Sequence, residues 1–100
     1  MTEQELLDVF RASASSVIKP DMLTPAGLLW VEQQIELAAA RGADDSRLAD
    51  AATARQLADE FFAAVFVHGP ARFGLAPSLL APPQLEQLAA AFAFWPFKRL

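Results

Sequence analysis

The amino-acid sequence predicts an all-α protein, a compact four-helix bundle with three longer helices and a short C-terminal helix. Patterns that cap helices recur along the chain, and apolar residues follow them at helical spacing. No segment shows the sustained alternation of apolar and polar residues that is typical of strands. One hundred residues fit a single helical domain, 1–100, and short connections between the first three helices favour antiparallel packing.

The first helix is expected from about Glu3 to Ile18. Thr2 and Glu5 match a capping box, in which each side chain accepts a hydrogen bond from the other residue's backbone amide. Pro20 then stops the helix. The residues expected to form its apolar stripe are Leu6, Leu7, Phe10, Ala14, Val17 and Ile18.

The second helix has equally clear start and stop signals. Thr24 is the expected cap, Pro25 occupies the first helical position, and Gly42 ends the helix. An arc of about 100° on this helix is expected to face the core. It comprises Leu28, Val31, Ile35, Ala38 and Ala39.

Two further apolar residues of this helix, Trp30 and Leu37, fall together on the side opposite to that arc. A helix with apolar residues on two sides is either central in its bundle or uses one side for another chain. Trp30 is therefore either covered within the fold or part of a subunit or partner interface, and the sequence leaves both alternatives open.

The third helix is expected to begin at Asp44 or Asp45, to run to about His68, and to end at Gly69-Pro70. Its first half is amphipathic, whereas the segment 61–67 is apolar all round. Another part of the chain must therefore cover that end.

A connection of about thirteen residues, 69–81, follows the third helix and precedes the last one. Pro82 and Pro83 are expected to open the short fourth helix, which should end at Phe94 or Trp95 because Pro96 follows. The connection and the fourth helix are the expected cover for the apolar end of the third helix.

Composition and charge narrow the classes of function. Residues 1–60 hold 11 acidic and 5 basic residues, and the whole chain has a net charge of −4, which argues against a general nucleic-acid binder. The chain has no cysteine, so disulfides and thiolate metal sites are excluded and a cytoplasmic location is expected. No secretory signal is visible, and the longest strongly apolar stretch is seven residues, against about 20 needed to span a bilayer.

The candidates for chemistry are few. His68 is the only histidine, and its place at a helix end favours a capping or packing role. Glu32 and Glu36 share a helix face, but no Glu-x-x-His pair accompanies them as a di-metal bundle requires. No phosphate loop, nucleophile elbow or dinucleotide fingerprint is present, so neither an enzyme nor a metal site is expected.

The segment 43–48, Ala-Asp-Asp-Ser-Arg-Leu, resembles acyl carrier proteins, which are also small, acidic and four-helical. In that family a serine after an aspartate, at the start of a helix, carries a phosphopantetheine arm, and the resemblance implies Asp45, Ser46 and Leu48 as the matching residues. Arg47 departs from the pattern, because leucine stands there in the family. A helix start by itself accounts for Asp-Asp-Ser, so no cofactor is expected.

The last nine residues, 92–100, hold four of the ten aromatic residues and must pack on the domain, a partner or a membrane. The function expected is a small, acidic, non-enzymatic protein-interaction module (adaptor, inhibitor or regulator) that acts as a homodimer or with a protein partner. Small-molecule binding beside the 69–81 connection and peripheral membrane association through the C-terminal tail are the alternatives. The expected partner-binding residues are Trp30, Leu37, Phe94, Trp95 and Phe97 as apolar anchors, with Arg72, Lys98 and Arg99 at the rim.

Overall fold

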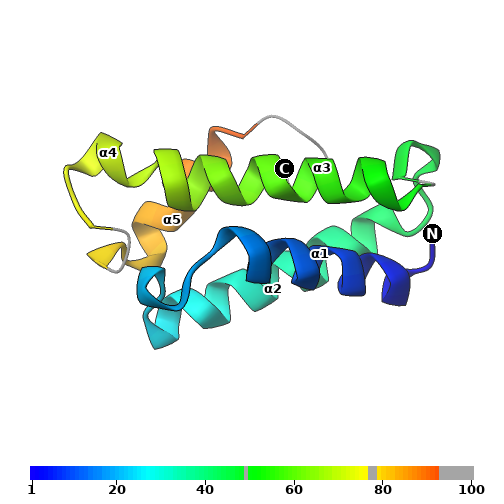
Figure 1. Cartoon of the computed structure of the whole chain (residues 1–100), viewed down its shortest axis with the longest axis horizontal. Helices are drawn as coiled ribbons and strands as arrows, with labels where there is room; N and C mark the ends of the chain where they lie inside the picture. The colour runs from blue at the N-terminus through cyan, green and yellow to red at the C-terminus, as the bar shows by residue number, and fades with distance from the viewer. Residues whose placement is uncertain (49, 77–78, 93–100) are drawn as a thin grey trace.

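A computed structural model describes residues 1–48, 50–76 and 79–92 (Figure 1). Its helices are α1 (Glu3–Val17), α2 (Pro25–Gly42), α3 (Ala51–Ala63), α4 (Pro70–Phe73) and α5 (Pro82–Ala90). Short 3-10 helices span Pro20–Met22 and Ser46–Leu48, and a π-helical turn spans Ala64–His68. These described ranges contain no strand, which confirms the predicted all-α helical bundle.

The helices α1, α2 and α3 form the body of the bundle. Helix α1 packs against both α2 and α3, which follow it in the chain. Helix α5 lies at one end of the molecule, where it contacts the π-helical turn and α2 (Figure 1). This placement means that α5 covers only part of the length of α2.

The first two helix starts have the caps that the sequence predicts. The hydroxyl of Thr2 accepts a hydrogen bond from the amide of Glu5 at 3.1 Å, and the Glu5 carboxylate accepts one from the amide of Thr2 at 3.1 Å. At α2 the hydroxyl of Thr24 accepts from the amide of Gly27 at 3.0 Å, and Pro25 is the first helical residue. Both contacts satisfy amides that a helix start leaves without an intrahelical partner.

The start of α3 is later than expected. The helix begins at Ala51 rather than at Asp44 or Asp45, and the carboxylate of Asp50 accepts hydrogen bonds from the amides of Ala52 (2.9 Å) and Thr53 (3.3 Å). The preceding 3-10 helix carries Leu48 into the core, where it is 3% exposed. Asp45 and Asp50 are both suitable caps, and burial of Leu48 between them favours Asp50.

The Asp50 cap is expected to depend on pH. Hydrogen bonds from the hydroxyl and amide of Thr53, and from the amide of Ala52, lower the pKa of the Asp50 carboxyl. Stability from such a group is present above its unfolded pKa and is lost as the pH falls through its folded pKa. We therefore expect Asp50→Ala to lower the Tm by a few degrees at neutral pH, and the difference from wild type to shrink in acid.

Thermal melts followed by circular dichroism from about pH 7 to about pH 2 would measure this difference. Asp50→Asn is the matched control, because asparagine caps a helix as well as aspartate but does not titrate. Equal Tm values for wild type and Asp50→Ala at neutral pH would contradict the role of this cap.

The helical backbone continues past Gly69-Pro70, where the sequence predicts an end. The π-helical turn lies directly before this pair, Pro70 begins α4, and the helix stops at Gly74, whose φ is 64°. Proline has no amide hydrogen, and in an α-helix its ring crowds the carbonyl four residues earlier. A wider π turn before Pro70 relieves this conflict, and Gly74 adopts the left-handed conformation that ends many helices.

The apolar end of the third helix is covered, as expected. Phe61, Phe62, Val65 and Phe66 are each at most 1% exposed. Helix α5 contacts the π-helical turn and buries its apolar side against this end, through Leu85, Leu88 and Ala89. It opens with two prolines as predicted, but it ends at Ala90 rather than at Phe94 or Trp95.

The contact between α1 and α3 contains a buried hydroxyl that the sequence analysis did not single out. The hydroxyl of Ser13 is fully buried and donates to Oδ1 of Asp59 at 2.5 Å. The Nε of Arg55 donates to the same oxygen at 2.9 Å. The carboxylate of Asp59 thus joins the two helices while satisfying the buried serine.

Candidate interaction surface

Trp30 lies in the core of the fold, with 3% of its surface exposed. Its ring lies 6.4 Å from that of Phe61 and 6.1 Å from that of Phe66, between centroids. The indole N–H donates to the carboxylate of Glu86 on α5 at 2.7 Å. Of the two alternatives that the sequence left open for Trp30, the structure shows the first: Trp30 is covered within the fold. Its side chain is therefore not available as a surface anchor.

Leu37 lies on the same side of α2 but is 48% exposed. Residues seven apart on a helix differ in direction by only about 20°, so the sequence grouped Leu37 with Trp30. The difference comes from α5, which reaches the first half of α2 through the Glu86–Trp30 hydrogen bond. The shared direction was predicted correctly, but only one of the two residues has a helix over it.

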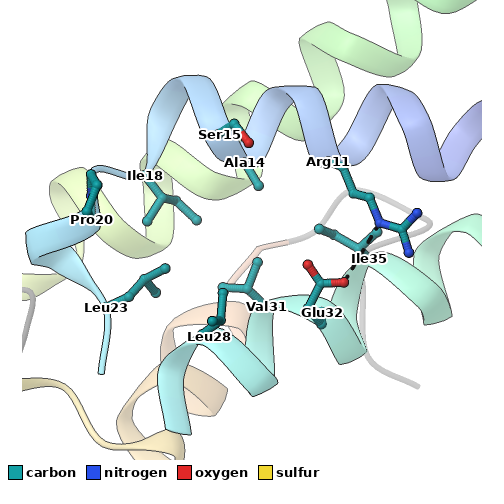
Figure 2. A pocket seen from close by; sticks show the side chains of 10 residues that line it. All are labelled: Arg11, Ala14, Ser15, Ile18, Pro20, Leu23, Leu28, Val31, Glu32 and Ile35. Atoms are coloured by element: carbon teal, nitrogen blue, oxygen red, sulfur yellow. Dashed lines mark ion pairs between the residues drawn. The ribbon is translucent and has the colours of Figure 1, made fainter. Parts of the chain in front are cut away.

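Leu28 corrects the predicted core arc of α2. The other members of that arc, Val31, Ile35, Ala38 and Ala39, are buried, whereas Leu28 is 52% exposed. Leu28 lies near the start of α2, where it lines a groove between α1 and α2 (Figure 2). Burial at this end of the helix is incomplete because α1 does not close over it.

The groove between α1 and α2 has a volume of about 450 Å³. Arg11 from α1 and Glu32 from α2 point toward each other across it, with 3.8 Å between Nε and Oε2 (Figure 2). Both side chains are close to half exposed, so this ion pair contributes little to stability. Apart from Ser15, the remaining lining is apolar: Ala14, Ile18, Pro20, Leu23, Leu28, Val31 and Ile35.

A second exposed set lies along the outer side of α2, and we name it the outer stripe. Its residues are spaced by three, four, four and three positions, which keeps them on one side of the helix. Its two leucines, Leu29 and Leu37, are 61% and 48% exposed. The outer stripe consists of Ala26, Leu29, Gln33, Leu37 and Ala40, all of them exposed. The sequence analysis singled out only Leu37, although the spacing of the set was readable from the sequence.

Arg72, the expected rim residue in the 69–81 connection, is exposed on α4. With His68 it lines a cavity of about 160 Å³ whose other lining residues are Ala64, Leu88, Ala91 and Phe92. A cavity thus forms near the place that the small-molecule alternative expects, but typical ligand pockets are about 300–1,000 Å³. Phe94, Trp95, Phe97, Lys98 and Arg99 lie outside the described residues.

The segment that resembles acyl carrier proteins adopts a short 3-10 helix. Ser46 is its first residue and is exposed, and Leu48, its last, is buried in the core. The α-helix that follows starts at Ala51, five residues after Ser46. In this part of the chain the serine therefore precedes a turn rather than a long helix.

No protein-family model, curated protein or solved structure matches this chain. Within residues 1–48, 50–76 and 79–92, no group of three or more metal-binding side chains is close enough to hold an ion. None of the helices in these ranges has the length and apolar character needed to cross a membrane.

Proposed function

We propose that this chain is a small, acidic, non-enzymatic protein-interaction module, an adaptor, inhibitor or regulator, whose binding surface is the exposed part of α2. One observation carries the proposal. Of the five large apolar side chains that are most exposed among the described residues, three lie on α2: Leu28, Leu29 and Leu37. The other two lie apart from α2: Val67 is in the π-helical turn, and Leu79 is in the connection before α5.

Two of these leucines, Leu29 and Leu37, share the outer side of α2, whereas Leu28 lines the groove toward α1 on the opposite side. Single exposed apolar residues are normal on protein surfaces, whereas contiguous apolar patches mark interaction sites. Burying a fully exposed leucine side chain is worth about 1.5–3 kcal/mol, so a partner that covers Leu29 and Leu37, each about half exposed, gains roughly that amount from the pair. The acidic residues elsewhere in 1–60 support solubility of the free protein, and a cytoplasmic location is part of this proposal.

Photo-crosslinking from the α2 surface would test the proposal. A photoreactive amino acid in place of Leu37 should give a discrete crosslinked product in cells that make the protein. The same amino acid in place of Gln56, which is exposed on α3, is the matched control. A product at Leu37 and none at Gln56 would support the proposal, whereas no product at Leu37, or equal products at both positions, would refute it.

A further inference from the structure

We propose that the partner of the outer stripe is a second copy of this chain, with the two α2 helices antiparallel and related by a twofold axis at Gln33. This inference rests on the proposed function and names the partner for the same surface. Its basis is the symmetry of the outer stripe about its central residue. A twofold interface uses the same patch on both subunits, so each residue must match the one at the mirrored position.

The outer stripe meets this requirement at every position. Counting from Gln33, leucines stand four residues away on both sides, at Leu29 and Leu37. Alanines stand seven residues away on both sides, at Ala26 and Ala40. In an antiparallel pair centred on Gln33, each leucine therefore faces a leucine of the second copy, and each alanine faces an alanine.

The spacing of the stripe also suits helix pairing. Intervals of three, four, four and three residues average 3.5, which is the repeat that keeps a seam facing a partner helix. The stripe spans about 21 Å of helix at 1.5 Å per residue. Alanines at its two ends let the helices approach closely, while the leucines nearer the centre provide most of the apolar area.

The central residue can pair with its own copy. The side-chain amide of Gln33 carries both a donor and an acceptor, so two such groups across a twofold axis can donate to each other. A single polar residue in an otherwise apolar seam specifies the register of helix pairs. Gln33 therefore selects the alignment in which the two leucine positions face each other.

Charge favours the antiparallel arrangement over the parallel one. Glu36 is the only charged residue of α2 whose side chain is largely exposed beside the stripe. A parallel pair in register would place the two Glu36 carboxylates side by side, which is destabilising. In the antiparallel pair Glu36 lies opposite position 30, and the two glutamates are offset by six residues, about 9 Å along the axis, close to one Debye length at physiological salt.

Single cysteines would test this geometry, because the chain contains none of its own. Gln33→Cys should form a disulfide-linked dimer under mild oxidation, about tenfold more than the exposed control Gln56→Cys. Ala26→Cys alone should not crosslink, since its two copies would lie about 21 Å apart and a disulfide needs Cα atoms within about 7 Å. A mixture of Ala26→Cys and Ala40→Cys should form the mixed disulfide.

Light scattering of the wild-type chain gives a second measurement that needs no substitution. Over a dilution series from about 1 mM to about 1 µM, the mass should fall from twice 10.8 kDa toward 10.8 kDa, because one helix pair is a small interface. The variant Leu29→Glu with Leu37→Glu should remain monomeric at every concentration. Both substituted side chains are exposed, so its Tm should stay within a few degrees of wild type.

The outcomes separate the inference from the proposed function. Self-crosslinking of Ala26→Cys would overturn the antiparallel geometry, and a wild-type chain that is monomeric throughout would overturn the dimer itself. In that case a Leu37 photo-crosslink to a different protein would leave the proposed function standing. A monomer without any Leu37 crosslink would overturn both.

Discussion

Replacing Trp30 with alanine is expected to lower the free energy of unfolding by about 3–5 kcal/mol. The indole is 3% exposed and packs between Phe61 and Phe66, so its removal leaves a cavity at the centre of the core. The change also removes the hydrogen bond to Glu86 that joins α2 to α5. A small domain has a total stability of only about 5–15 kcal/mol, so the loss is a large fraction of it.

Urea unfolding followed by circular dichroism would measure this loss, with Leu37→Ala as the matched control. Leu37 lies two turns further along the same side of α2 but is 48% exposed, so its truncation should change stability by no more than about 0.5 kcal/mol. Trp30→Phe, which keeps an aromatic ring but cannot donate to Glu86, should fall between the two. Equal stabilities for Trp30→Ala and Leu37→Ala would show that Trp30 is not a core residue.

The substitution Gly69→Ala should destabilise the protein by about 3 kcal/mol, although alanine in place of glycine usually stabilises a helix. A Cβ at this position would lie 2.5 Å from the backbone oxygen of Val65 and 2.6 Å from Cδ1 of Leu88. The first contact is with backbone, which cannot move aside as a flexible side chain can. Gly69 therefore allows the close approach of α5 to the end of the π-helical turn.

Gly27→Ala is the control for this prediction, because the nearest atoms to its added Cβ are side-chain atoms at 3.3 Å or more. It should cost much less than Gly69→Ala in the same urea unfolding experiment. In a Leu88→Ala background the further cost of Gly69→Ala should shrink, because one of the two clashes is gone. A Gly69→Ala protein that is more stable than wild type would contradict the close packing of α5.

Local signals predicted the helix starts that depend on contacts between near neighbours in the chain. Thr2, Thr24 and Pro82 each act within their own first turn, through a cap or through the fixed φ of proline, and the structure confirms all three. The start of α3 was wrong because Asp45 and Asp50 are both suitable caps. The choice between them depends on how Leu48 packs in the core, and core packing is not a local property of the sequence.

The pair Gly69-Pro70 is a second case in which a local signal was overruled. Both residues favour a helix end, yet the chain stays helical through a π turn as far as Phe73. The apolar residues before the pair bury themselves against α5, and continuing the helix keeps that packing. The tendency of two residues to end a helix was weaker than the burial of the segment that precedes them.

The sequence by itself determined that this protein is an all-α bundle, because capping contacts and apolar spacing act over a few residues. It also determined the direction in which each residue of α2 points, including the symmetric outer stripe around Gln33. Only the tertiary structure decided that Trp30 is covered while Leu28 and Leu37 are exposed. Burial depends on which helix lies opposite, and α5 crosses α2 over one part of its length, a placement set by packing between segments more than fifty residues apart.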